Sequence, residues 1–289
     1  MCPAPPPPSG WPRSGSLLDR VDRRLSAPFF DLPSLGAMEV FVSVPGNCFG
    51  QPAWLFPVSP VALAAASEGA SFKLIAAAAL LAAAHGALWF VAVSDGGQPR
   101  LFRLLYHKVW VYAGPAASLL ALRAAPQHAR AAAGFFVAAW FAGIVPVLVL
   151  KSAAQRPRPC ATRPAPNRYF EIIARTLRDH DAHQSLPSGD CAGAAIFAVA
   201  LALFHGAPKL GTACVFASAF GRLYYQAHHL LDVALGALIS GAVAFFFVST
   251  FDFASHPILK PLGFQAASMT TLAAWKKLHP GHTDARPGG

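Results

Sequence analysis

The chain has 289 residues, of which 55% are hydrophobic and only 12% are charged, and its mean hydropathy is +0.44. A soluble domain carries about 25% charged residues, so this composition argues against an ordinary soluble protein and indicates one embedded in lipid. The formal net charge of +10 is typical of basic residues that face anionic lipid. Nucleic-acid binding is not indicated, because the sequence has no basic stripe with interleaved aromatics and no reader motif.

The N-terminal part precedes the clearly apolar stretches. Residues 1–53 are rich in Pro, Gly and Ser, which predicts a flexible tail. They show no apolar core followed by a cleavage site, so we expect no signal peptide of the usual kind. Residues 54–71 are moderately apolar but are interrupted by Pro57 and Pro60, which predicts a segment at the membrane interface.

Six apolar stretches follow, and they predict an all-α, polytopic membrane bundle over residues 72–251. A spanning helix needs about 20 apolar residues, and shorter runs require tilt or local thinning of the bilayer. Six spans would place residues 151–189 and 222–229 on one side of the membrane, and the tails 1–53 and 252–289 on the other. The stretches are Phe72–Val93, Leu105–Leu122, Ala131–Leu150, Asp190–Phe204, Leu210–Tyr225 and Leu230–Phe251.

The long loop between the third and fourth stretches has two further features. In residues 168–178, aromatic and aliphatic side chains alternate with arginines at roughly helical spacing. This pattern predicts either an interfacial helix or a short helix packed on the end of the bundle. Cys160 and Cys191 bracket the loop, so a bridge between them is conceivable. The five cysteines form no CxxC pair, however, and indicate neither a zinc site nor a disulfide framework.

Ionisable residues at membrane depth are costly and tend to be functional, and here they gather in three clusters on one side. The first cluster follows the third apolar stretch and contains Lys151 and Arg158. Several cations at one membrane edge suit a phosphate group, because lysine is a compact charge and arginine a bidentate donor. An anchor for lipid headgroups is the alternative interpretation.

The second cluster contains Ser188, Gly189 and Asp190, directly before the fourth apolar stretch. Ser188 is a plausible helix N-cap, and Gly189 lets the backbone approach a ligand closely. A helix N-terminus presents N–H groups and a positive dipole end, so it can bind an anion. The simpler interpretation is a capped helix start with no ligand.

The third cluster contains Arg222, His228, His229 and Asp232. His228 and Asp232 are four residues apart and would share one face of a helix. A carboxylate bonded to one ring nitrogen fixes the tautomer and leaves the other nitrogen able to attack. Spacing alone does not exclude His229, which lies three residues before Asp232. Arg222 would face elsewhere on an unbroken helix, so a shared site requires a turn between Arg222 and His228.

Together the clusters resemble the signature of the type 2 phosphatidic acid phosphatase superfamily, the lipid phosphate phosphatases. Residues 151–159 match the family's pattern of Lys, six residues and Arg-Pro. Residues 187–190 are similar to its Pro-Ser-Gly-His. Residues 221–232 are similar to its Ser-Arg, five residues, His, three residues and Asp. The order, the spacing and the six-span layout fit over roughly residues 72–251.

The resemblance implies a role for each matched residue. His228 would attack phosphorus, Asp232 would orient His228, and water would then hydrolyse the phospho-histidine. Neither a metal nor another cofactor is implied, because clustered cations would stabilise charge on the transferring phosphoryl group. The phosphate would be held by Lys151, Arg158, Arg222, Ser188 and the Gly189 N–H.

Two positions depart from the family pattern. Gly221 replaces a serine, which removes one hydroxyl. Asp190 replaces a histidine that the family is thought to use to protonate the leaving group. A free aspartate has a pKa of about 3.9, so only about one in a thousand is protonated at pH 7. Asp190 would therefore need a strongly raised pKa to act as the acid.

Three hypotheses follow from Asp190. It is a working acid in the loaded site, or the leaving group is itself a phosphate and needs less acid help, or the protein only binds lipid phosphates. His180 and His183 are possible substitute acids. Phosphoryl transfer to an alcohol is a further alternative. The resemblance implies an endomembrane such as the endoplasmic reticulum, with the site facing the lumen or exterior; the sequence does not indicate the oligomeric state.

Overall fold

The computed structural model describes residues 17–50, 54, 56–67, 70–94, 109–162, 184–250 and 270. Every regular element within these ranges is a helix, which confirms the predicted all-α class. The arginine-containing segment 168–178, His180, His183 and the tail 252–289 apart from Thr270 lie outside the described residues. Cys160 and Cys191 are both free thiols, so no bridge closes the loop between them.

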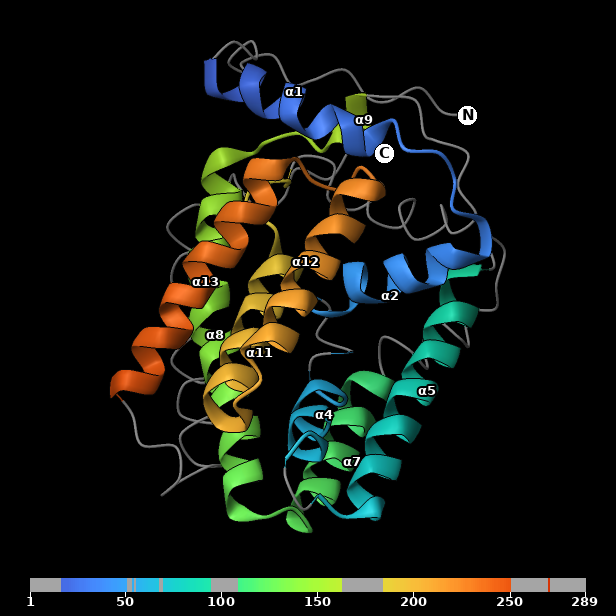
Figure 1. Cartoon of the computed structure of the whole chain (residues 1–289), viewed down its shortest axis with the longest axis vertical. Coiled ribbons are helices and arrows are strands. Elements are labelled where there is room, and N and C mark those ends of the chain that lie inside the picture. The colour runs from blue at the N-terminus through green and yellow to red at the C-terminus, as the bar shows by residue number, and fades with distance from the viewer. Residues whose placement is uncertain are drawn as a thin grey trace.

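Four helices form the main bundle (Figure 1): α8 (Gln127–Ala154), α11 (Gly189–His205), α12 (Pro208–Tyr224) and α13 (Leu230–Thr250). Local signals set their ends. Gly206 closes α11 in the left-handed conformation with φ 60°, and Pro208 then starts α12. Their core is aromatic and aliphatic and includes Phe135, Phe136 and Ile196. The C-terminal ends of α8 and α12 and the N-terminal ends of α11 and α13 therefore lie at the same end of the bundle (Figure 1).

A smaller group packs on the first half of α8 and consists of α4 (Ser59–Ala65), α5 (Phe72–Ser94) and α7 (Val111–Arg123). The sequence places residues 54–71 at a membrane interface, but α4 from this segment is buried. Its Val61, Leu63 and Ala64 are fully covered in the contact with α8 and its neighbours. The apolar character of α4 thus reflects packing against other helices.

The prediction of a flexible tail is wrong for much of residues 17–50. This stretch forms α1 (Leu17–Phe30), the 3-10 turn η1 (Gly36–Met38) and α2 (Glu39–Cys48). Long-range hydrogen bonds hold it to the bundle. The fully buried Glu39 carboxylate, for example, accepts from the Tyr224 hydroxyl at 2.7 Å. Such partners lie almost two hundred positions away, and local composition does not reveal them.

The N-terminal helix also lies at an unexpected end of the bundle. The predicted six spans put both tails opposite the polar loops, yet Asp19 of α1 pairs with Arg156, directly after α8. Figure 1 shows α1 across that end, while α2 and α4 lead the chain toward the opposite end, where α5 begins. This extra passage of the chain accounts for the difference.

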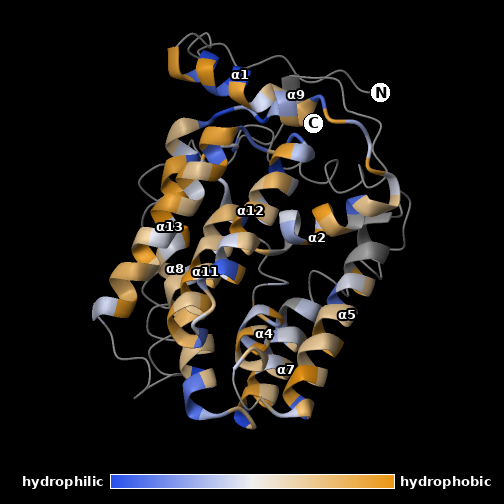
Figure 2. Cartoon of the chain, viewed as in Figure 1, coloured by the Kyte–Doolittle hydropathy of each residue, from blue (hydrophilic) through white to orange (hydrophobic). Residues whose placement is uncertain are grey.

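Two of the described helices, α8 and α13, are long and apolar enough to cross a membrane. Phe72–Leu88 and Gly189–His205 are apolar but shorter. Hydrophobic residues dominate the middle of the molecule, and hydrophilic residues gather mostly at its two ends (Figure 2). This distribution fits a bundle in lipid, whereas the count of six spans stays a prediction.

Candidate active site

The three polar clusters meet at one end of the main bundle, and a turn between α12 and α13 makes this possible. The turn that the sequence requires between Arg222 and His228 is present, since α12 ends at Tyr224 and α13 starts at Leu230. Gln226 adopts φ 55° within it, and the Ala227 N–H donates to the Arg222 carbonyl at 3.0 Å. The third cluster is thereby folded back on itself.

His228 is almost fully buried, and two contacts define its tautomer. Its Nδ1 lies 2.6 Å from the Ser185 carbonyl oxygen, which can only accept, so Nδ1 carries the proton. Its Nε2 lies 3.0 Å from Arg158 Nη1, which can only donate, so Nε2 carries a lone pair. Burial first, and then the Arg158 charge, hold the pKa of His228 well below its ordinary range. The site therefore contains a neutral imidazole whose Nε2 lone pair faces the Arg158 guanidinium.

Asp232 is fully buried and accepts from several donors around the turn. The His229 N–H donates to Oδ2 at 2.7 Å, and the Ser185 hydroxyl donates to the same oxygen at 2.5 Å. Asp232 Oδ2 is 3.8 Å from His228 Nδ1, beyond hydrogen-bond distance. The sequence predicts that Asp232 orients His228 directly, but the structure inserts Ser185 between them. Asp232 fixes the Ser185 hydroxyl, and the Ser185 carbonyl holds the ring.

Three buried cations converge on the same end, and each donates to a backbone carbonyl oxygen, while Arg222 also forms an ion pair with the Asp190 carboxylate. Lys151 Nζ donates to Gln184 O at 2.6 Å, and Arg158 Nη1 donates to Ala227 O at 2.9 Å. Arg222 Nη1 donates to Gly46 O at 3.1 Å. A carbonyl oxygen positions a cation without cancelling its full charge. This arrangement gives the site a positive character that suits phosphate oxygens.

The start of α11 lies at the same end of the bundle as the two other polar clusters and is capped as the sequence predicts. Ser188 is the N-cap, and its hydroxyl accepts from the Cys191 N–H at 3.4 Å. Its own N–H donates to the Asp232 carbonyl at 2.9 Å, which joins α11 to α13. A Cβ on Gly236 would lie 2.3 Å from the Ser188 carbonyl oxygen, so glycine is required for this approach. A Cβ on Gly189 would meet no atom within 4 Å, so there is open space beside this residue.

Asp190 occupies the position of the family histidine, and in the structure both of its oxygens face donors. Oδ1 accepts from the Gly50 N–H at 2.8 Å, and Oδ2 forms an ion pair with Arg222 Nε at 3.3 Å. These contacts make Asp190 an acceptor that links α2 to the third cluster. They give no support to Asp190 as a proton donor.

The other departure, Gly221, has a packing explanation. A Cβ on Gly221 would lie 2.5 Å from the Val42 carbonyl oxygen and 2.7 Å from Gly46 Cα. Gly46 faces it in the same way, because its own Cβ would lie 2.9 Å from Gly221 Cα. The serine of the family pattern would therefore clash with α2. The exchange lets α2 approach the backbone of α12 next to Arg222.

Sequence reasoning missed two residues of this network, Ser185 and Arg156. Arg156 Nη1 lies 2.6 Å from Asp232 Oδ1, while its Nη2 pairs with Asp19 at 2.8 Å and Asp22 at 2.7 Å. Burial alone would lower the pKa of Arg156, but these three carboxylates raise it above its ordinary value. Arg156 lies within the first cluster, two residues before Arg158. Its acidic partners lie in the segment predicted as a tail, so the sequence offered no signal for its role.

The buried His229 of the turn predicts a loss of stability in mild acid. Burial first, and then the Arg156 charge, lower the pKa of His229 to about 4. Between about pH 6.5 and 4 the unfolded chain binds a proton on His229 that the native state excludes. The free energy of unfolding therefore decreases as the pH is lowered, by up to about 3 kcal/mol. We expect the melting temperature in detergent to fall between pH 7 and 4.5, and to fall less in His229→Asn. Equal falls in the two proteins would contradict this.

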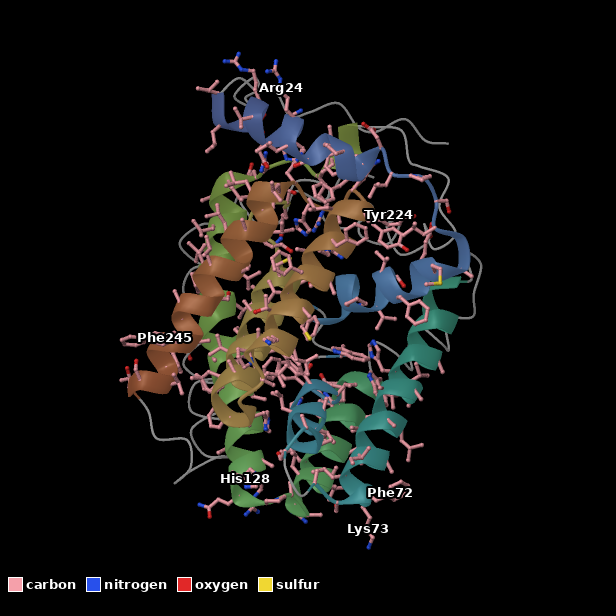
Figure 3. All side chains as sticks on the ribbon, in the orientation of Figure 1. Arg24, Phe72, Lys73, His128, Tyr224 and Phe245 are labelled. Atoms are coloured by element: carbon pink, nitrogen blue, oxygen red, sulfur yellow. The ribbon has the colours of Figure 1, made fainter. Side chains whose placement is uncertain are left out.

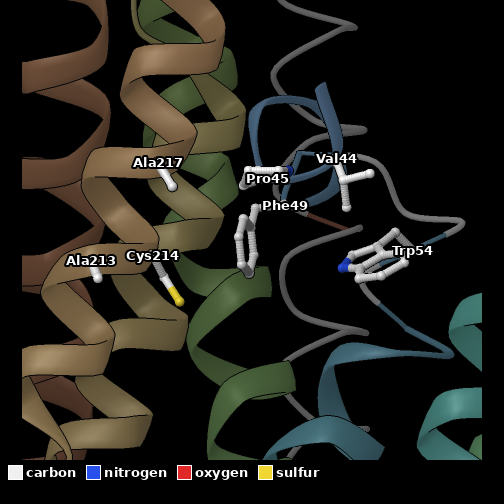
Figure 4. A pocket seen from close by; sticks show the side chains of 7 residues that line it. All are labelled: Val44, Pro45, Phe49, Trp54, Ala213, Cys214 and Ala217. Carbon is white, nitrogen blue, oxygen red and sulfur yellow. The ribbon is translucent and has the colours of Figure 1, made fainter. Parts of the chain in front are cut away.

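An apolar groove lies between α2 and α12, below the polar end of the bundle (Figure 4). It has a volume of about 320 Å³. Gly46 and Gly50, which contact Arg222 and Asp190, lie on and just after the same helix α2 that lines it. The groove thus borders the polar site through one helix. Its lining residues are Val44, Pro45, Phe49, Trp54, Ala213, Cys214 and Ala217.

Comparison with known proteins agrees with this geometry. A family model described as the PAP2 superfamily matches residues 131–255, which include all three polar clusters and helices α11, α12 and α13. No curated protein and no solved structure matches the chain. The match supports the assignment of residues 131–255, with their ordered clusters of cations and the buried His228, to the PAP2 superfamily, whose members are phosphatases and phosphoester hydrolases.

Proposed function

We propose that the protein is a membrane-bound, metal-independent lipid phosphatase that acts through a phospho-histidine on His228. One observation carries the proposal: the neutral imidazole of His228 directs the lone pair of Nε2 toward Arg158, in a site with two further buried cations. Phosphoryl transfer requires a nucleophile and several cations around the same phosphate group, and Nε2 of His228 and the three cations could surround one phosphate in this way.

The reaction would proceed in two displacements. Nε2 of His228 forms a bond to phosphorus as the bond between phosphorus and the lipid oxygen breaks, and the lipid oxygen leaves with the electron pair. Lys151, Arg158 and Arg222 would stabilise the charge on the three transferring oxygens. Water then attacks phosphorus, the phosphorus–nitrogen bond breaks, and inorganic phosphate leaves. The Ser185 carbonyl oxygen would accept a hydrogen bond from Nδ1–H throughout. This bond keeps the proton on Nδ1 and stabilises the ring while the ring carries positive charge.

The surroundings of Asp190 favour a lipid diphosphate as the substrate. Oδ1 of Asp190 accepts from the Gly50 N–H and Oδ2 forms an ion pair with Arg222, so the residue at the usual acid position is held as a carboxylate acceptor. A phosphate leaving group has a pKa near 7 and departs without strong acid help, whereas an alkoxide does not. General-acid help is typically worth about 100- to 10,000-fold, so its loss would disfavour phosphate monoesters such as phosphatidate.

Two features support a lipid rather than a soluble phosphate. The groove between α2 and α12 is lined by apolar side chains and borders the site through α2, so it suits a hydrocarbon chain (Figure 4). The apolar helices fit a multi-pass protein with about six spans, including α8 and α13. Following the family resemblance, we propose an endomembrane location with the active-site end toward the lumen or exterior.

The proposal is tested by phosphate release from phosphatidate and from a prenyl diphosphate, with purified protein in detergent and a chelator present. We expect release from the diphosphate without added metal. No release from either lipid would favour a protein that only binds lipid phosphates. Transfer of phosphate to an added alcohol in preference to water would indicate a phosphotransferase instead.

Replacement of Asp190 tests the leaving-group argument. We expect Asp190→Asn to retain diphosphate hydrolysis within about tenfold, because the asparagine carbonyl still accepts from the Gly50 N–H and no acid is lost. We expect Asp190→His to raise phosphatidate hydrolysis relative to diphosphate hydrolysis, since it introduces a group that titrates near neutral pH. If Asp190→Asn abolished diphosphate hydrolysis, Asp190 would be the acid and the argument would fail.

A further inference from the structure

Helix α13 begins directly after the turn that carries His228, and the residue before it provides no side-chain cap. The first N–H groups of a helix have no partner within the helix, and a Ser, Thr, Asp or Asn at the preceding residue usually satisfies one of them. Here that residue is His229, which has no side-chain oxygen, and its own N–H donates to Asp232. The N–H groups of Leu230 and Leu231 therefore need acceptors that His229 does not supply.

Helix α1 supplies both acceptors. The Ser26 hydroxyl accepts from the Leu230 N–H at 2.9 Å, and Asp22 Oδ1 accepts from the Leu231 N–H at 2.8 Å. Both side chains are buried, and the Ser26 hydroxyl donates in turn to the Asp22 carbonyl oxygen at 2.7 Å. The Asp22 charge also lies at the positive end of the α13 dipole, where a carboxylate is stabilising. Two residues of α1 thus form the N-terminal cap of α13.

Helix α1 also holds the earlier part of the turn. The Gln226 side chain donates to the Phe30 carbonyl at 3.3 Å, and the Phe30 ring packs edge-on against His229. Together with the cap of α13, these contacts join α1 to the chain on both sides of His228. Helix α1 lies outside residues 131–255, so the family match does not include this support of the turn.

The start of α13 sets the position of the His228 ring, because His228 lies only two residues before Leu230 in a buried segment. The two contacts of the ring, with the Ser185 carbonyl and with Arg158, come from segments outside the turn. A shift at the start of α13 would therefore change both distances together. A misplacement of about 1 Å can slow a reaction on the order of 100-fold.

We propose that Asp22 and Ser26 are positioning residues for the reaction at His228. By capping α13 they hold the imidazole in its place between the Ser185 carbonyl and the phosphate-binding cations, and they do so without touching the substrate. This role rests on the proposed function, because it concerns turnover at His228. Asp22 also pairs with Arg156 at 2.7 Å, whereas the neutral Ser26 hydroxyl isolates the cap from that ion pair.

Steady-state hydrolysis of a prenyl diphosphate, with a chelator present, tests the positioning role. We expect Ser26→Ala to lower kcat about 10-fold and Asp22→Ala about 100-fold. KM should change less than about twofold, because the cations that bind the phosphate stay in place. Asp22→Asn should retain more activity than Asp22→Ala, because its amide oxygen can still accept from the Leu231 N–H.

Arg24→Gln is the matched control. Arg24 lies between the two capping residues on α1, but it is exposed and points away from the bundle (Figure 3). It should keep the wild-type kcat. Leu230→Pro removes the donor instead of the acceptor, and proline is tolerated at the first position of a helix. It should lower kcat as Ser26→Ala does, and it decides the question if an alanine variant does not fold.

Hydrogen–deuterium exchange of the same proteins in detergent follows the cap without turnover. We expect the amides of Leu230 and Leu231 to exchange about tenfold faster in Ser26→Ala and Asp22→Ala, while amides in the middle of α11 keep the wild-type rate. Unchanged exchange at Leu230 and Leu231 would overturn the cap. An active wild type with unchanged kcat in Ser26→Ala and Leu230→Pro would overturn the positioning role alone, whereas a wild type that hydrolyses no lipid phosphate would refute the proposed function.

Discussion

Replacement of His228 by alanine is expected to reduce lipid diphosphate hydrolysis by on the order of 10,000-fold or more, because it removes the nucleophile. The neutral imidazole has its Nδ1 proton committed to the Ser185 carbonyl and its Nε2 lone pair on the side of Arg158. Initial rates with a chelator present, over a range of substrate concentrations, measure the effect on kcat and KM separately.

His229→Ala is the matched control for this experiment. His229 is also buried, but its ring packs on Phe30, and its Nδ1 has no hydrogen-bond partner in the described part of the chain. We expect the His229 variant to retain activity within about tenfold, with a lower melting temperature from the lost packing. Comparable large losses in both variants would indicate that the turn had collapsed and would leave the nucleophile unassigned to His228.

The covalent intermediate gives a second measurement. With a substrate labelled in the transferred phosphate, rapid denaturation in alkali should trap label on the wild-type protein. That label should be lost in acid, as expected for a phosphorus–nitrogen bond. The His228→Ala protein should trap none, while His229→Ala should trap as much as wild type. Hydrolysis without any trapped label in the wild type, at times shorter than one turnover, would contradict a phospho-histidine.

The parts of the fold and site that could be predicted from sequence are those set by short-range spacing. Periods of apolar residues predict α8 and α13, and the cap at Ser188 predicts the start of α11. The turn between Arg222 and His228 follows from the geometry of a helix, since the two side chains cannot share one face. Each of these signals lies within a few residues of the feature that it predicts.

The parts that could not be predicted depend on partners far along the chain. Asp22 caps α13 across more than two hundred positions, and Glu39 is buried under Tyr224 across a similar separation. Ser185 interposes its carbonyl and hydroxyl between His228 and Asp232, although the i,i+4 spacing suggests direct contact. Gly221 reads as a lost hydroxyl in sequence and is a helix-packing residue in three dimensions. Composition and periodicity carry no information about such pairings.

Loss of the Arg156 guanidinium is expected to lower kcat by about 10- to 100-fold while KM changes little. Arg156 lies 2.6 Å from Asp232 Oδ1 and is gripped by Asp19 and Asp22, so it is a positioning residue that acts through Asp232. Asp232→Asn should show a loss of similar size. In a serine–histidine–aspartate triad the corresponding change costs about 10,000-fold, because the carboxylate alone fixes the histidine tautomer. Here the Ser185 carbonyl retains that role, and the loss should be smaller.

A double-mutant cycle separates this role from a merely structural one. If Arg156 acts through Asp232, adding Arg156→Gln to Asp232→Asn should lower kcat only slightly further. The double variant should then have about the same kcat as the less active of the two single variants. Arg156→Lys should restore part of kcat, because one ammonium can reach Asp232 but cannot also span to both carboxylates of α1. Losses that multiply in the double variant would show independent effects. A raised KM with unchanged kcat would place Arg156 on the substrate phosphate instead, beside Arg158.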